Sequence, residues 1–98
     1  MKVVITGFSP FGEETRNPSW EAVKRLPREI EGAVIHKMEL PVVFGESLCR
    51  LGEVIGQIEP DIVICVGQAG GRCSITPEWL AVNVRDSKNA DNAGRRFA

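Results

Sequence analysis

The chain has 98 residues, which allows one layered domain with a small core, because small domains bury a smaller share of their surface than large ones. Its 12 basic and 13 acidic residues nearly cancel, and no run of like charge stands out. This balance argues against nucleic acid and against an acidic membrane surface as partners, so we expect a small molecule or another protein.

The cysteines and the apolar runs indicate a cytoplasmic location. Cys49, Cys65 and Cys73 are odd in number and form no CxxC pair, which favours free thiols in a reducing compartment over a disulfide framework or a metal site. The longest apolar run, Ile62 to Val66, is far too short to span a membrane, and the start MKVVITG has the pattern of a strand instead of a signal peptide.

Three segments have strand patterns. Lys2 to Thr6 is a β-branched run that ends at Gly7, and Asp61 to Val66 is a continuous apolar run. Such runs are typical of parallel strands covered on both faces, so we predict that both strands are interior and that Cys65 is a buried, inert thiol. Val34 to Leu40 alternates more moderately and predicts a further strand.

Two segments between these strands have helix patterns. Asn17 and Pro18 fit an N-cap followed by proline at the first helical position, and the helical spacing of apolar residues continues until Pro27. Apolar residues from Phe44 to Ile58 then recur at steps of three and four, which predicts an amphipathic helix that ends before Pro60.

The order strand, helix, strand, helix, strand predicts an α/β fold with three layers, α/β/α, and a mostly parallel central sheet. A weaker run, Trp79 to Val84, is a candidate for a fourth strand. The carboxyl ends of parallel strands meet at one edge of the sheet, where open α/β sheets bind ligands. We therefore expect a site between the loops Gly7 to Asn17 and Gly67 to Pro77.

The first of these loops, GFSPFG, contains two phenylalanines, Phe8 and Phe11, and loops are usually polar. The two rings either pack under the loop as an extension of the core or form the walls of a small apolar pocket. The residues of the loop do not decide between these alternatives.

The second loop, GQAGGR at residues 67–72, is rich in glycine but matches no phosphate-binding pattern. Glycine allows close approach of the backbone to a ligand, and the amide of Gln68 both donates and accepts hydrogen bonds. Two interpretations of Gln68 are open: its amide forms hydrogen bonds with the polar edge of a ligand, or it bonds to the backbone of its own turn.

Two further residues are chemically interesting. Glu78, after this loop, is a solvated charge or a functional carboxylate. His36 lies in the middle of a predicted strand, away from the ligand edge, so a triad of Cys73, His36 and Glu78 within this chain is disfavoured.

Three motifs together resemble pyroglutamyl peptidase type I: GFSPFG, NPSW at residues 17–20, and above all VGQAGGRCSITPEWLAVN at residues 66–83. The resemblance runs in order from Lys2 to Gly94. It implies a cytosolic cysteine peptidase of α/β/α fold that removes N-terminal pyroglutamate from peptides, without a metal or an organic cofactor. Residues 1–98 would be the N-terminal part of a single such domain.

The resemblance also implies roles for individual residues. Glu78 would be the catalytic glutamate, Phe8 and Phe11 would hold the faces of the lactam ring, Gln68 would recognise its polar edge, and Val42 would contribute more loosely. A pyroglutamyl ring is flat and uncharged with one N–H and one C=O, so aromatic walls and one amide suit it.

The sequence departs from the family pattern in ways that matter for activity. The catalytic cysteine and histidine lie in the family's later half and have no counterpart here, so we expect the 98-residue chain to be inactive alone. Trp79 replaces a basic residue, Asn89 stands where the family adds an apolar residue to the pocket, and the final GRRFA diverges. A truncated gene product, a cloned fragment and a piece of a longer protein all fit this pattern.

One alternative to the peptidase is a non-catalytic domain that binds lactam-type ends or associates with other chains. Two predicted helices are too few to cover both faces of the sheet, which leaves apolar surface exposed. We therefore expect a homo-oligomer whose interface uses Trp79 to Val84 or the uncovered sheet face.

Overall fold

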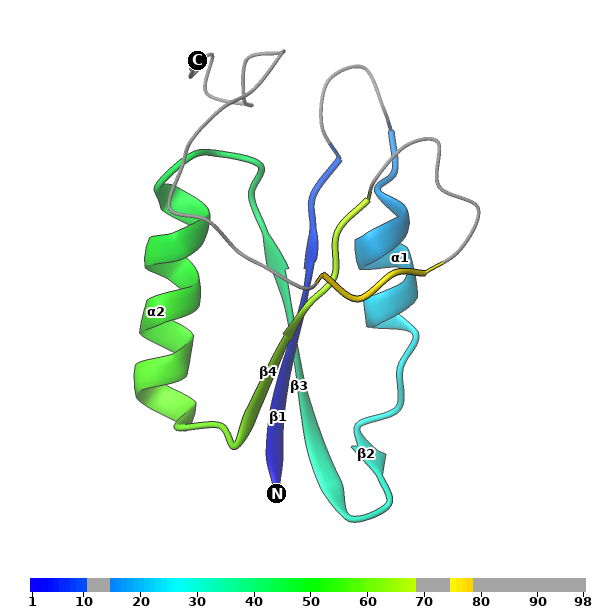
Figure 1. The fold of residues 1–98 in the computed structure, drawn as a ribbon, viewed down its shortest axis with the longest axis vertical. Helices are drawn as coiled ribbons and strands as arrows, with labels where there is room; N and C mark the ends of the chain where they lie inside the picture. The colour runs from blue at the N-terminus through cyan, green and yellow to red at the C-terminus, as the bar shows by residue number, and fades with distance from the viewer. Residues whose placement is uncertain (11–14, 69–74, 79–98) are drawn as a thin grey trace.

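The computed structural model describes residues 1–10, 15–68 and 75–78. The elements follow one another as strand β1, helix α1, strands β2 and β3, helix α2 and strand β4 (Figure 1). Their bounds are Lys2–Phe8 for β1, Pro18–Lys24 for α1, Glu29–Ile30 for β2, Ala33–Leu40 for β3, Glu46–Ile58 for α2 and Ile62–Cys65 for β4. The three predicted strands and the two predicted helices are therefore confirmed, and Trp79 to Val84 lies outside the described residues.

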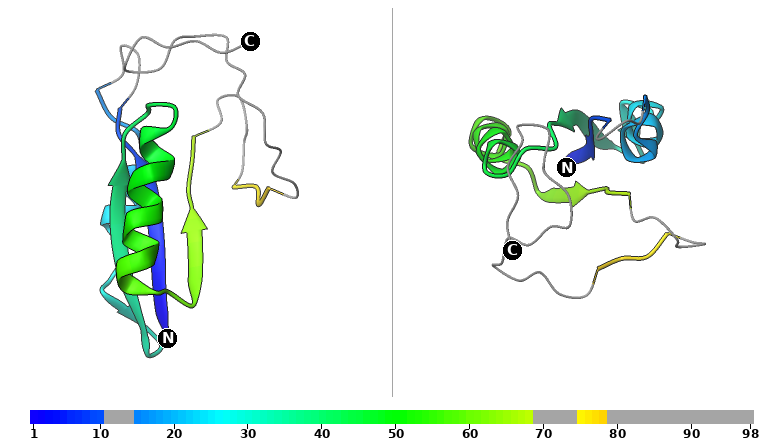
Figure 2. Two further views of the ribbon diagram at one scale, coloured as in Figure 1. Left: turned by 90° about the vertical axis from the view of Figure 1, so that its left-hand side faces the viewer. Right: turned by 90° about the horizontal axis from the view of Figure 1, so that it is seen from above.

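The four strands form one mostly parallel sheet in the order β2-β3-β1-β4. β1 pairs in parallel with β3 and with β4, while β2 pairs antiparallel with β3. The sheet lies between α1 and α2, which cover opposite faces (Figures 1 and 2). This arrangement confirms the predicted α/β/α layers.

The core lies between the sheet and α1. Val3 and Ile5 of β1 form a buried cluster with Val23 of α1 and Ile35 of β3. Val4, on the other face of β1, is fully buried as well. The prediction that the first strand is interior and covered on both faces is therefore confirmed.

Helix α1 begins as the sequence predicts, with Asn17 as its N-cap and proline directly after it. The Asn17 side chain accepts a hydrogen bond from the backbone N–H of Ser19, which satisfies one of the open donors at the helix start. The helix ends at Lys24, ahead of Pro27. Lys37 on β3 donates from Nζ to the carbonyl oxygens of Lys24 and Leu26 and so holds this end of the helix against the sheet.

The prediction that the last strand is interior and covered is wrong for β4 within the described residues. Ile62, Val63 and Ile64 are 42%, 38% and 45% exposed, and Cys65, expected as a buried thiol, is exposed too. The reason is the position of β4 at the end of the strand order, where it has a described neighbour on one side alone. Leu48 on α2 is likewise 69% exposed.

Strand β2 was not predicted. It forms a tight hairpin with β3, in which Ile30 pairs with Ala33 across the two residues Glu31 and Gly32. Both of these residues have positive φ, 49° and 86°. No helix in the part of the chain that the structure describes has the length and hydropathy needed to cross a membrane.

Candidate functional site

A pocket of about 210 Å³ opens at the carboxyl ends of the parallel strands. Its lining comes from four segments: the end of β1, the residue before α1, the segment after β3 and the segment after β4. The lining residues are Phe8, Asn17, Val42, Gly67 and Gln68. Residues that are distant in the sequence thus meet at the sheet edge where the topology places a ligand site.

Three of the residues proposed from the sequence, Phe8, Val42 and Gln68, line this one pocket. Phe11 lies outside the described residues. Glu78 is described and exposed, and it is not among the residues that line the pocket. The structure therefore brings together three of the four ring-binding candidates, and Glu78 is not among the described residues that line their pocket.

Asn17 is a pocket residue that sequence reasoning identified as a helix cap and missed as part of the site. It is 3% exposed and lines the pocket beside Phe8. The signal was its place in the sequence, since Asn17 closes the same loop that carries Phe8.

Two hydrogen bonds lie within the cap of α1, and two more connect this cap to the backbone at the end of β1. Ser19 donates to Asn17 Oδ1 from its backbone N–H at 3.0 Å and from its hydroxyl at 2.7 Å. The Ser19 hydroxyl in turn accepts from the backbone N–H of Phe8 at 2.9 Å, and Asn17 Nδ2 donates to the carbonyl oxygen of Ser9 at 3.1 Å. Ser9 is held on its other side by a bond from its N–H to the Leu40 carbonyl at 2.9 Å. These bonds fix the backbone that carries the Phe8 ring.

The pocket contains no charged side chain among the described residues that line it. Phe8 and Val42 are apolar, and the two polar side chains, Asn17 and Gln68, are neutral amides. A site of this kind suits a small uncharged ligand with both apolar faces and a polar edge. The Glu21 carboxyl has a pKa below its ordinary value, because Lys24 donates a hydrogen bond to it, but it lies on α1 outside the pocket lining.

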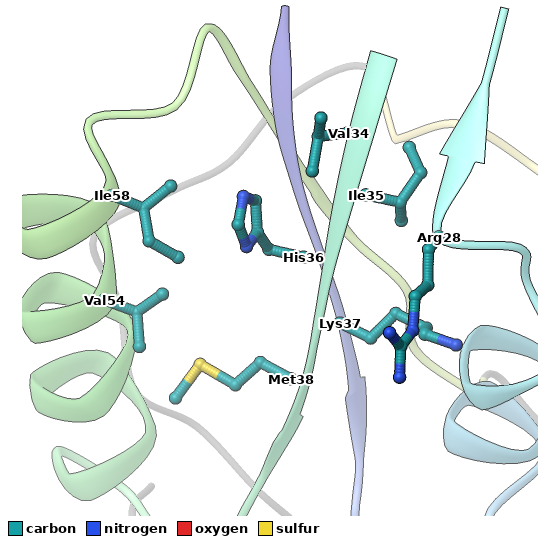
Figure 3. A pocket seen from close by; sticks show the side chains of 8 residues that line it. All are labelled: Arg28, Val34, Ile35, His36, Lys37, Met38, Val54 and Ile58. Atoms are coloured by element: carbon teal, nitrogen blue, oxygen red, sulfur yellow. The ribbon is translucent and has the colours of Figure 1, made fainter. Parts of the chain in front are cut away.

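A second, larger cavity of about 490 Å³ lies along β3 (Figure 3). His36 and Met38 point from the strand toward α2, where Val54 and Ile58 face them, whereas Lys37 points to the opposite side. His36 sits mid-strand, in register with Val4, and is not among the residues of the smaller pocket, as the sequence led us to expect. Within the described ranges, no three metal-ligating side chains gather at one place.

Comparison with known proteins gives one consistent result. The family model of pyroglutamyl peptidase matches residues 1–98. The pyrrolidone-carboxylate peptidases of Thermosipho melanesiensis and Enterococcus faecalis are 56% and 55% identical to the chain over 96 residues, which is 98% of its length.

Solved structures agree with these sequences. The crystal structure of pyroglutamyl peptidase I from Bacillus amyloliquefaciens matches 98% of the chain with a TM-score of 0.93 and 54% identity. A mutant pyrrolidone carboxyl peptidase from Pyrococcus furiosus matches 99% of the chain with a TM-score of 0.94 and 43% identity. The chain spans about half the length of the curated relatives it matches, 48% and 45% for the two named above, and 46% and 47% of the two solved chains.

Proposed function

Since the chain belongs to the pyroglutamyl peptidase family, we propose that it forms the N-terminal part of a cysteine peptidase domain that removes N-terminal pyroglutamate from peptides. The observation that carries this proposal is the uncharged pocket at the sheet edge, which combines an aromatic ring, an aliphatic side chain and two amides. In this proposal the pocket binds the lactam ring, and the activity belongs to a protein that also carries a cysteine and a histidine.

The chemistry of the ring explains why such a pocket is selective. Phe8 and Val42 bury the apolar part of the lactam, and the Gln68 amide is able to satisfy its N–H or its C=O. Phe11, from the same loop as Phe8, would provide the second aromatic wall. An ordinary peptide would bring a charged α-amino group into a pocket whose described lining offers no charged partner, and the desolvation of that ammonium opposes its binding.

The proposed reaction divides its work between the two parts of the family's sequence. The thiolate of a cysteine outside this chain attacks the pyroglutamyl carbonyl carbon, and the peptide C–N bond breaks to leave a pyroglutamyl thioester. A histidine outside this chain, which takes up the thiol proton, gives it to the leaving amine, and water then hydrolyses the thioester to pyroglutamate and the free thiol. Glu78 orients that histidine and stabilises its cationic form, as the third member of a triad.

A titration of the 98-residue chain with pyroglutamic acid amide, followed by ¹⁵N–¹H NMR, tests the pocket. We expect the backbone amide signals of Phe8, Gly67 and Gln68 to shift together, because the two loops share one site. Proline amide, which has the same ring size but a charged amine, is the matched control and should cause no comparable shifts. Shifts confined to one of the two loops would contradict a shared lactam site.

The role of Glu78 is tested in a polypeptide that also carries the family's cysteine and histidine. Loss of the orienting carboxylate in Glu78→Gln should lower kcat by a factor on the order of 10⁴ and leave KM nearly unchanged. Glu59→Gln, an exposed position at the end of α2, is the matched control and should leave both constants unchanged. An unchanged kcat for Glu78→Gln would remove Glu78 from the triad.

The proposal extends to the location and assembly of the protein. Cys49 and Cys65 are unpaired in the structure, which suits the reducing cytoplasm. The exposed apolar residues Ile62 to Ile64 and the open side of β4 favour self-association. We expect the working protein to be a cytoplasmic homo-oligomer.

A further inference from the structure

Asn17 is the buried polar residue of the pocket whose orientation the structure fixes most fully. It is 3% exposed, and it lines the pocket together with Phe8 and Gln68. Its Oδ1 accepts two hydrogen bonds from Ser19, at 3.0 Å from the backbone N–H and at 2.7 Å from the hydroxyl. Both lone pairs of this oxygen are therefore in use.

The same bonds exclude the flipped orientation of the amide. If the amide turned over, its NH₂ group would face the N–H of Ser19, and its oxygen would face the carbonyl oxygen of Ser9. The first contact would set two donors against each other and the second would set two acceptors against each other. Asn17 is thus held with its oxygen toward α1 and its NH₂ group toward the loop that follows β1.

This orientation determines what Asn17 offers to a ligand. Of the two hydrogens on Nδ2, one is donated to Ser9 at 3.1 Å, and the other has no acceptor among the described residues. Asn17 has no free lone pair to present, so its chemistry toward the pocket is that of a donor alone. Gln68, in contrast, is exposed, and no such pair of bonds from the described residues fixes its amide, so it suits either edge of a ligand.

We propose that Asn17 donates its second N–H to the ring carbonyl oxygen of the bound lactam and thereby makes the pocket selective for a ring with a carbonyl at that place. The inference rests on the proposed function and deepens it, because it divides the recognition of the ring between two residues. Asn17 donates to the ring C=O, and the amide oxygen of Gln68 accepts a hydrogen bond from the ring N–H. A buried donor left without an acceptor disfavours rings that lack the carbonyl.

The test uses the 98-residue chain and three uncharged probes, with dissociation constants from NMR titrations. Pyroglutamic acid amide tests the lactam site itself. The matched pair 3-oxocyclopentanecarboxamide and cyclopentanecarboxamide differs in the ring carbonyl alone, so the ratio of their dissociation constants isolates that group. Two substitutions, Asn17→Asp and Asn17→Ser, remove the NH₂ group and keep an oxygen suited to the N-cap.

In the parent chain we expect the ring with the carbonyl to bind about tenfold more tightly than the ring without it. Both Asn17 variants should bring this ratio to about one. Ser19→Ala is the control, because it weakens the hold on the loop but leaves the Asn17 amide in place. Ser19→Ala should weaken the binding of both probes by the same factor and preserve the ratio of their dissociation constants.

Each other result contradicts a specific part of the inference. If the Asn17 variants weaken the binding of both rings by the same factor, Asn17 holds the loop in place and does not recognise the carbonyl group. A carbonyl preference that survives in both folded variants would assign the donor to another residue. If the parent chain prefers the carbonyl ring but does not bind pyroglutamic acid amide, the proposed function fails and the selectivity of Asn17 stands.

Discussion

Gly7 lies where β1 passes under the first turn of α1, and the two backbones are in close contact there. A methyl group at Gly7 would lie 2.7 Å from the Cα and N atoms of Trp20 and 2.9 Å from the carbonyl carbon of Ser19. These are backbone atoms, so no side-chain rotation relieves the overlap. The whole of α1 would have to move, and with it the hydrogen bonds that hold the pocket loop.

We expect Gly7→Ala to lower the free energy of unfolding by about 1–3 kcal/mol, the usual cost of overpacking. Gly56→Ala is the matched control, because a methyl group there meets no atom within 4 Å. Gly56 lies in α2, so alanine at this position should raise the free energy of unfolding by up to about 1 kcal/mol. Urea denaturation at one fixed protein concentration measures both. Equal stability of Gly7→Ala and the parent chain would show that α1 moves away at no cost.

Helices and strands could be predicted from the sequence where the periodic pattern of apolar side chains extends over several turns or residues. The stripe from Phe44 to Ile58 gives α2 to within a few residues, and proline after asparagine gives the start of α1. The two-residue strand β2 is too short to show alternation, and both of its residues are exposed. Its signal lies in the turn, where Glu31 and Gly32 take positive φ.

The burial of β4 was predicted wrongly for a different reason. The sequence DIVICV describes side chains suited to a strand that is covered on both faces, whereas exposure depends on which neighbours are in place. In the candidate site, too, the sequence identified some residues and missed another. Phe8, Val42 and Gln68 were assigned to the pocket from a family resemblance, whereas Asn17 was interpreted as a helix cap alone, although it closes the loop that carries Phe8.

The molecule as a whole exposes apolar surface along an open strand. Ile62, Val63 and Ile64 are all more than one third exposed, and β4 ends the strand order of the described sheet. Unpaired N–H and C=O groups beside apolar side chains favour pairing with another chain. We therefore predict that this edge of the described sheet governs self-association.

We expect sedimentation equilibrium at low micromolar concentration to show an oligomer, and Ile64→Lys to shift it toward the monomer, because a charge on an edge strand opposes pairing. Gln57→Lys on the exposed surface of α2 is the control, since it adds the same charge away from β4. A parent chain that sediments as a monomer and unfolds cooperatively on heating would show that the exposed edge is tolerated.

The central position of β1 also sets the order in which the chain can fold during synthesis. β1 is made first, yet its two parallel partners come later, and its first residue, Lys2, bonds through its N–H to the side chain of Asp61, 59 positions along the chain. At a translation rate of about 5–20 residues per second, roughly 3–12 seconds separate the two residues. By the end of that interval α1, β3 and α2 have been made, but β1 still lacks β4, one of its two parallel neighbours. We therefore expect the nascent protein to be most vulnerable to aggregation before its last described strand has been made.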